Sequence, residues 1–176
     1  MLLKGNHIFL RALEPSDADI LYKWENDPAL WQVSFTQIPF SRFILEEFVN
    51  AAHHDIYTNK QLRLMACRNS DEKPAGIVDL FDFDPQHARC GLGIYINEAY
   101  RGLGHATESL EMVKDYAFGV LHLKQVYVHV NFSNSASIAL FEKSGFEKNG
   151  LKKSWNKTGI SSYEDVWFLQ CLNPVV

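Results

Sequence analysis

The stretch Arg101-Gly102-Leu103-Gly104-His105-Ala106 decides how the fold is interpreted, because it lies between an apolar strand-like run and an amphipathic helix. Its two glycines let the backbone approach a ligand without a Cβ atom in the way, and Arg101 adds a fixed positive charge. The unpaired N–H groups at the start of the following helix point back at this loop. The stretch is therefore a candidate phosphate-binding loop, although a plain strand-to-helix turn with two glycines fits the same six residues.

The flanking segments predict alternating strands and helices. Upstream, the run Gly91–Ile96 (GLGIYI) predicts a strand, and glycines inside a strand are typical of a bulge or of close backbone approach. Downstream, apolar residues spaced by three and four predict a helix from about Ala106 to about Val120. Alternating valines at 126, 128 and 130 predict the next strand, and a short helix that stops at Gly145 follows it.

Weaker patterns cover the N-terminal half of the chain. We expect strands near Ile8–Arg11, Arg63–Cys67 and Gly76–Phe83, and helices near Ala18–Trp24 and Arg42–His53.

The segment between these two helices, from Pro28 to Pro39, is expected to be a loop. It carries the large aromatic residue Trp31, followed by Phe35, and Phe40 comes directly after it. Such rings either pack half-buried against the domain or line a ligand site. We include Trp31 among the candidate substrate-binding residues.

Composition limits the class of protein. A chain of 176 residues fits a single domain, here 1–176. The cysteines Cys67, Cys90 and Cys171 are odd in number and lack metal-ligand spacing, so we expect buried thiols and no metal site. Without a bilayer-length apolar run or a signal peptide, a cytoplasmic location is expected. The formal net charge of −4 argues against nucleic acid or anionic membranes as partners and is compatible with a cationic substrate.

Several motifs together resemble one family. The run 101–106 resembles the acetyl-CoA pyrophosphate signature (Q/R-x-x-G-x-G/A) of the GNAT superfamily of N-acetyltransferases, and residues 134–146 (NSASIALFEKSGF) resemble its second signature. The segments 7–18 (HIFLRALEPSDA) and 24–28 (WENDP), with the closing Gly150-Leu151 and residues 163–166 (YEDV), are similar to one branch of it. That branch holds the ribosomal-protein N-terminal acetyltransferases and the spermidine/diamine acetyltransferases, and the resemblance covers nearly the whole chain.

This resemblance implies a fold and a co-substrate. The fold would be α/β (α+β), with a mixed, mostly antiparallel GNAT-like central sheet flanked by helices and splayed at a bulged strand near 91–96. The co-substrate would be acetyl-CoA, with the strand bonding to its pantetheine amides and the loop holding its pyrophosphate. The implied cofactor-binding residues are Ile94, Tyr95, Ile96, Arg101, Gly102, Leu103, Gly104, His105, Ala106, Thr107, Asn134, Ser137 and Phe141.

Acetyl transfer to an amine also requires a base, because an alkylamine arrives as an ammonium with a pKa of about 10. Asp79 and Asp82 lie on the strand before the bulged one, on opposite faces by period-2 counting. We favour Asp79, since burial between Val78 and Leu80 would raise its pKa, and we also count it as a substrate-binding residue. A solubilising edge charge is the competing interpretation of Asp79.

His129 alternates onto the face that it shares with Tyr127, and as a lone histidine on a strand it is interpreted as structural. Phe141 stands where many GNAT enzymes have a tyrosine that can reprotonate the CoA thiolate. Phenylalanine has no such proton, but a thiolate with a pKa of about 8.5 can leave without an acid, so we expect Phe141 to pack beside CoA. Some relatives also have an acidic residue where Gly91 stands, so that candidate base is missing here.

The leading substrate hypothesis is a small primary amine, a polyamine or diamine. The resembling branch includes such enzymes, and carboxylates could contact further ammonium groups. The candidate carboxylates are Asp79, Asp82, Glu46, Glu47 and Asp55. Two alternatives stay open: the α-amine of a protein N-terminus, including ribosomal proteins, and a catalytically silent acyl-CoA-binding module, for which Phe141 is the hint. Assembly into a homo-oligomer is also open.

Overall fold

The computed structural model describes residues 3–34 and 36–175 of the chain. Within them the strands are β1 (Ile8–Ala12), β2 (Leu62–Arg68), β3 (Pro74–Asp84), β4 (Arg89–Ile96), β5 (Gln125–Asn131), β6 (Glu147–Lys157) and β7 (Tyr163–Leu172). The α-helices are α1 (Ala18–Glu25), α2 (Pro28–Ser34), α3 (Arg42–Ala51), α4 (Ile56–Asn59), α5 (His105–Gly119) and α6 (Ser135–Lys143), and short 3-10 helices lie at Pro15–Asp17 and Glu98–Tyr100. No helix among the described residues is long and apolar enough to cross a membrane.

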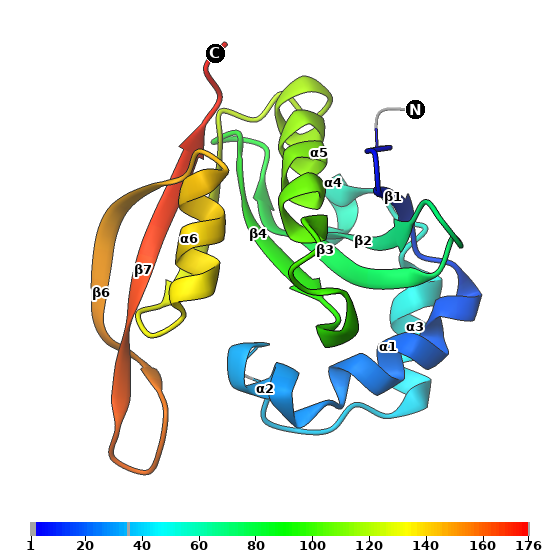
Figure 1. The fold of residues 1–176 in the computed structure, drawn as a ribbon, viewed down its shortest axis with the longest axis horizontal. Helices are drawn as coiled ribbons and strands as arrows, with labels where there is room; N and C mark the ends of the chain where they lie inside the picture. Colours follow the sequence, from blue (N-terminus) through cyan, green and yellow to red (C-terminus); the bar gives the residue numbers. More distant parts are fainter. Residues whose placement is uncertain (1–2, 35, 176) are drawn as a thin grey trace.

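The strands form one sheet in the order β1-β2-β3-β4-β5-β7-β6 (Figure 1). Every neighbouring pair is antiparallel except β4 and β5, which are parallel. The predicted mixed, mostly antiparallel sheet flanked by helices is therefore confirmed. In Figure 1, β6 and β7 form a long hairpin that extends beyond α6.

The parallel pair separates after a short stretch. Its register covers Arg89↔Gln125, Cys90↔Val126 and Gly91↔Tyr127, and β4 then runs on to Ile96 while β5 runs on to Asn131. We call the segments beyond the last pair, 92–96 of β4 and 128–131 of β5, the splay. The expectation that the sheet is splayed near residue 91 is confirmed.

The bulge lies elsewhere than predicted. β4 pairs with β3 without interruption from Ile96 to Gly91, and the register shift falls in β3 between Phe81 and Asp84. Asp82 has a φ of 48° there, in the left-handed region. The glycines of β4 have other uses: a Cβ at Gly91 would lie 2.3 Å from the Phe81 ring, so this glycine makes room for a neighbouring side chain.

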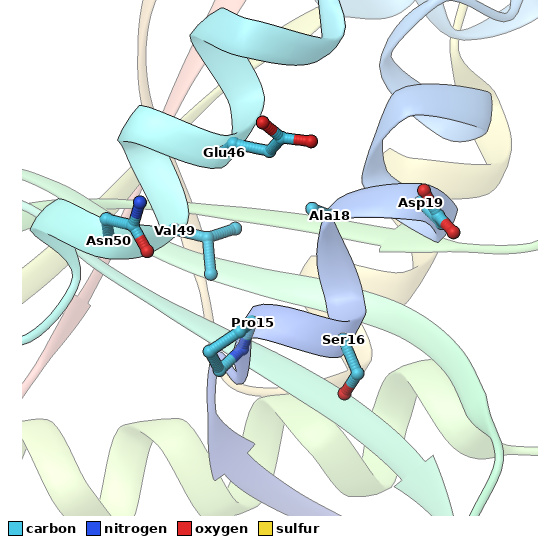
Figure 2. A pocket seen from close by; sticks show the side chains of 7 residues that line it. All are labelled: Pro15, Ser16, Ala18, Asp19, Glu46, Val49 and Asn50. Carbon is cyan, nitrogen blue, oxygen red and sulfur yellow. The ribbon is translucent and has the colours of Figure 1, made fainter.

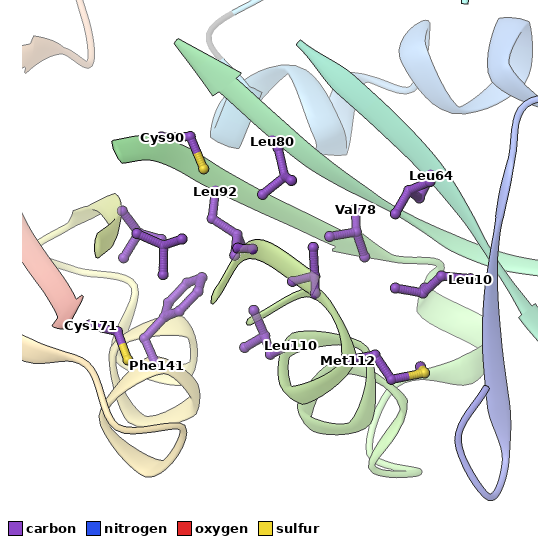
Figure 3. Packing of buried hydrophobic residues seen from close by; sticks show 14 of the residues in the cluster. Leu10, Leu64, Val78, Leu80, Cys90, Leu92, Leu110, Met112, Phe141 and Cys171 are labelled. Atoms are coloured by element: carbon purple, nitrogen blue, oxygen red, sulfur yellow. The ribbon is translucent and has the colours of Figure 1, made fainter. Parts of the chain in front are cut away.

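One face of the sheet packs against α5 and α6. Strand side chains such as Val78 and Leu92 meet Leu110 of α5 and Phe141 of α6 in the larger hydrophobic core (Figure 3). The predicted apolar stripe of α5 is confirmed, since Leu110, Val113 and Ala117 are fully buried. Val120, predicted to be the last residue of this stripe, is instead about half exposed just after the helix. We call this side of the sheet the first face.

The opposite side, the second face, is covered by helices over only part of its width. There α1 and α3 pack on β2 and β3, with Leu21, Trp24 and Leu45 meeting Met65 and Ile77. Further across the same face, the exposed or half-buried side chains are those of Asp79, Phe81, Tyr127, His129 and Phe168. This uncovered part runs beside the splay.

The N-terminal segment differs from the sequence prediction in one place. Residues 28–34 form α2, so the predicted loop begins with a helix, and Phe35 lies outside the described residues. The short helix α4 and strands β6 and β7 were not predicted as elements. β6 exposes most of its residues and is the edge strand next to β7, so its sequence carries no alternating apolar pattern. The three cysteines are buried free thiols, as expected.

Candidate active site

The loop before α5 has the geometry of an anion-binding loop. Gly102 and Gly104 have φ values of 75° and 80°, which L side chains rarely adopt, and nothing would meet a Cβ at either position. The N–H of Glu108 donates to the Gly104 carbonyl at 3.0 Å, as expected of the first bond within the helix. The amides of residues 105–107 precede that bond, so they point out of the start of α5, as an anion-binding site requires.

Arg101 is fixed relative to β4. Its Nε–H donates to the Ile96 carbonyl at 3.0 Å, and the residue is otherwise exposed. A guanidinium has five N–H donors, so four remain for an anion. His105 contributes differently from the other residues of the loop, because its side chain is buried and burial lowers its pKa. We therefore expect His105 to face the pyrophosphate with its backbone N–H and not with its imidazole.

The second signature begins where β5 ends. Asn134 is the N-cap of α6, and its Oδ1 accepts a hydrogen bond of 3.1 Å from the N–H of Ser137. The loop 101–104 follows β4 and Asn134 follows β5, so both signatures lie at the carboxyl ends of the two parallel strands. A ligand inserted in the splay would contact both. Cofactor binding by Asn134 and Ser137 stays a prediction.

Phe141 lies in the core. It is 4% exposed and packs edge-to-face on Phe146, with ring centroids 5.2 Å apart. The ring supports α6 from inside the protein. Contact between Phe141 and the cofactor stays a prediction.

The carboxyl end of β4 is the segment predicted to bind the pantetheine arm. Because the register with β5 stops at Gly91, the β5-facing backbone groups of residues 92–96 are not paired with β5. Ile94 packs toward the larger core, whereas Tyr95 contacts Trp24 edge-to-face on the second face, at 5.5 Å between centroids. Hydrogen bonds from Ile94, Tyr95 and Ile96 to pantetheine stay predicted, and the register leaves room for them.

Asp79 lies on the second face in a compact ion cluster. Its oxygens accept bonds of 2.7 and 2.8 Å from Nε and Nη2 of Arg63, whose Nη1 donates to Glu25. The side chains of Arg63, Asp79 and Glu25 are 15%, 19% and 10% exposed. Sequence reasoning missed Arg63 and Glu25, because only the pairing Arg63↔Asp79 and the packing of α1 bring them together.

The predicted substrate residue Trp31 joins the same region. Its indole Nε1–H donates to the Glu25 carbonyl at 2.6 Å, so α2 is anchored to the end of α1 next to the ion cluster. Trp31 is thus linked to Asp79 through the Glu25 backbone and side chain and through Arg63. Substrate contact by either side chain stays a prediction.

Asp82 is on a different face from the one predicted. The bulge in β3 breaks the period-2 alternation, and the carboxylate interacts with Tyr127 and His129, which project from the second face. Burial raises the pKa of the Tyr127 hydroxyl, and the charge of Asp82 adds to that rise. Asp79 and Asp82 thus share one face, contrary to the period-2 count.

A cavity of about 320 Å³ lies away from these residues, between α1 and α3 (Figure 2). Glu46 lines it together with Asp19, and the Asp19 carboxylate pairs with Arg42. Glu47 is exposed on α3, and Asp55 accepts the Thr58 N–H at the start of α4. The additional carboxylates predicted to bind substrate are therefore separate from the Asp79 cluster.

Comparison with known proteins identifies the family. Residues 7–147 match the model of the Acetyltransferase (GNAT) domain. Because the match spans most of the chain, the protein belongs to the GNAT acetyltransferases, with acetyl-CoA as co-substrate.

Relatives are found among polyamine acetyltransferases. The chain is 29% identical over 147 residues to the spermidine N(1)-acetyltransferase of Escherichia coli K12, covering 83% of this chain and 76% of that protein. The crystal structure of spermidine N-acetyltransferase from Vibrio cholerae in complex with CoA and spermine superposes with a TM-score of 0.84 at 26% identity, covering 94% and 95% of the two chains. Another structure of that enzyme, described as dodecameric, gives 0.77 at 26% identity over 94% and 93%.

Proposed function

We propose that the protein acetylates a primary amine of a polyamine or diamine. The observation that carries this proposal is the cluster of Glu25, Arg63 and Asp79 on the second face. Two carboxylates against one guanidinium leave one net negative charge beside the splay, and such a charge attracts a second ammonium of the substrate. The similarity to the spermidine acetyltransferases of E. coli and V. cholerae supports the same substrate class.

The reaction would take place at the splay. The loop 101–107 would hold the pyrophosphate, and the unpaired edge of β4 would hold the pantetheine arm, so that the thioester reaches the point where the strands separate. Holding the carbonyl within attack distance of the amine supplies much of the rate. A backbone N–H of β4 is the expected donor to the oxyanion of the tetrahedral intermediate.

We assign Asp79 to ammonium binding. Both of its oxygens already accept hydrogen bonds from Arg63, and proton removal would compete with those bonds. A carboxylate can nevertheless attract a distant ammonium while it remains bonded to Arg63, because Coulomb attraction does not need a free lone pair. Its earlier expected role as the base stays a prediction, and so does that of Asp82.

A thiol-release assay with acetyl-CoA tests the proposal. Spermidine, a short diamine, a simple alkyl monoamine and a Ser- or Ala-initiated peptide are compared at equal concentrations, with mass spectrometry of the products. We expect acetylated spermidine or diamine at the highest kcat/KM. Preference for the peptide would replace this function with N-terminal acetylation of proteins, and release at background level with every amine would leave an acyl-CoA-binding module.

Two further features belong to this proposal. We infer a reducing, cytoplasmic setting, which the three buried free thiols support. We also infer self-association. Exposed aromatic side chains on and near β6 and β7, namely Phe132, Trp155 and Tyr163, support it, together with the dodecameric relative. Sedimentation velocity measures the state directly, and a monomer at every concentration would contradict it.

A further inference from the structure

A second polar group lies on the second face, around His129. This residue is in β5, two positions beyond Tyr127, where the pairing with β4 ends. Alternate residues of a strand share a face, and the rings of Tyr127 and His129 lie 5.6 Å apart between centroids. His129 is exposed, so its imidazole faces solvent where the two parallel strands begin to separate.

The second face carries no side chain at the matching position of β4. Gly93 is two positions beyond Gly91, the last β4 residue paired with β5. A Cβ at Gly93 would make only ordinary contacts, at 3.7 Å with Asp79 and 3.8 Å with Phe81. The glycine therefore leaves room for a Cβ-sized group on the β4 backbone, beside Asp79 and Phe81 of β3.

His129 already contacts an alkylammonium group in the free protein. The Nζ of Lys152, on β6, lies 2.9 Å from Nε2 of His129 and 4.4 Å from the centroid of the Trp155 ring. An ammonium has only donors, so Nζ–H donates and Nε2 accepts, which requires an unprotonated Nε2. A lysine side chain ends in the same chemical group as a diamine, so this position is suited to a substrate ammonium.

Every element packed around His129 bears on its protonation. Lys152 on β6 contributes a positive charge, Asp82 on β3 a negative one, Tyr127 on β5 a neutral hydroxyl, and Phe168 on β7 an apolar ring at 5.4 Å. The ring is partly covered by these neighbours although the residue is exposed, and this partial burial lowers the pKa of His129; Lys152 lowers it further, and Asp82 opposes both. The imidazole is therefore neutral at neutral pH and can accept a proton.

We propose that His129 accepts the proton that the substrate ammonium loses, and that Lys152 occupies the place of this ammonium until an amine displaces it. The inference rests on the proposed acetylation of an alkylamine and not on which amine is used. The ammonium gives one proton to Nε2, and the freed lone pair attacks the thioester carbonyl. Collapse breaks the C–S bond, the second amine proton neutralises the thiolate, and His129 returns its proton to water.

The first test measures the imidazole itself. The His129 ring is titrated by NMR in the parent, in Lys152→Met and in the matched control Lys153→Met, whose native ammonium pairs with Asp165 at 2.8 Å. Removing a neighbouring positive charge favours the protonated ring, so Lys152→Met should raise the pKa of His129, while Lys153→Met leaves it in place. An unchanged His129 pKa in Lys152→Met would overturn the pairing.

The second test measures turnover. His129→Gln should lower kcat by about 10²–10⁴ and remove the acid limb of the pH profile of kcat/KM, with the acetyl-CoA dissociation constant unchanged. In Lys152→Met the acid limb should move to higher pH and the KM for the amine should fall. A His129→Gln enzyme with the parental kcat and profile contradicts the proposal.

These outcomes are separable from the function itself. If the parent acetylates no amine, the proposed function fails, while the NMR titration still decides whether Lys152 controls His129. If His129→Gln also loses acetyl-CoA binding, its low kcat says nothing about proton transfer, and the shift of the acid limb in Lys152→Met decides. An acid limb that stays in place in Lys152→Met then rejects His129 as the proton acceptor.

Discussion

Gly104 shows what a single residue contributes to the geometry of the predicted cofactor-binding loop. It starts α5 in the left-handed conformation with a φ of 80°, and space around it is open. The sequence alone predicts that a side chain here would block the phosphate. The structure adds that any L residue would strain the backbone itself, by about 1–3 kcal/mol.

We therefore expect Gly104→Val to abolish acetyl-CoA binding and to lower the free energy of unfolding by about 1–3 kcal/mol. The matched control is Gly119→Val at the last position of the same helix, where φ is not positive and nothing lies within 4 Å. Calorimetric titration and chemical denaturation measure the two effects. Normal binding by Gly104→Val would show that the loop is not the pyrophosphate site.

Asp79→Asn separates two roles of one carboxylate. If Asp79 binds a second ammonium, the KM for spermidine rises about tenfold or more while kcat and the pH profile stay close to the parent. The control is Asp71→Asn, which weakens an Arg–Asp pair with Arg68 in the β2–β3 hairpin. A drop in kcat of about 10²–10⁴ with a flattened acid limb would instead make Asp79 the base.

At the scale of elements, Asp17 links the start of α1 to β1 through its ion pair with Arg11. Its carboxylate is 4% exposed, bonds to both terminal nitrogens of Arg11 at 2.7 and 2.9 Å, and accepts the Glu14 N–H at 2.8 Å. Burial alone would raise the pKa of Asp17, but the Arg11 guanidinium and the Glu14 N–H outweigh burial and lower it. Fixing this corner holds α1, and with it Glu25, against the second face.

Asp17→Asn should lower the free energy of unfolding at pH 7 by about 3 kcal/mol, because Arg11 loses its charged partner. A lowered folded-state pKa stabilises the fold above the unfolded-state pKa of about 4, and this contribution disappears as the pH falls below that value. The gap between parent and variant should therefore be smaller at pH 3 than at pH 7. Urea denaturation at both values measures it, with exposed Asp19→Asn as control.

Local patterns predicted most elements but not how they are placed side by side. The 3.6-residue periodicity of α5 and the alternation of β5 are local signals, and both elements are present within one or two residues of the prediction. The bulge at Asp82 follows from pairing between strands, so counting along β3 put this side chain on the wrong face. Strand β6 was missed because an exposed edge strand needs no apolar alternation.

At the scale of the whole molecule, the proposed site lies where two parallel strands separate. The motifs after β4 and β5 could be recognised as a predicted acetyl-CoA site from the sequence, because each is a contiguous run with its own local geometry. The acceptor side could not be predicted in the same way. Glu25, Arg63 and Asp79 come from α1, β2 and β3, and His129 meets Lys152 from β6, so only the folded chain assembles them.

Acetylation of a cationic polyamine at the splay is tested most directly by the salt dependence of the reaction rate. Partly exposed charges are screened within about 8–10 Å at physiological ionic strength, whereas a peptide is held mainly by backbone bonds and side-chain pockets. The measurement is kcat/KM for spermidine and for a neutral Ser- or Ala-initiated peptide over a series of salt concentrations. We predict that spermidine is preferred and that its advantage shrinks as ionic strength rises; a peptide preferred at every salt concentration would contradict the account.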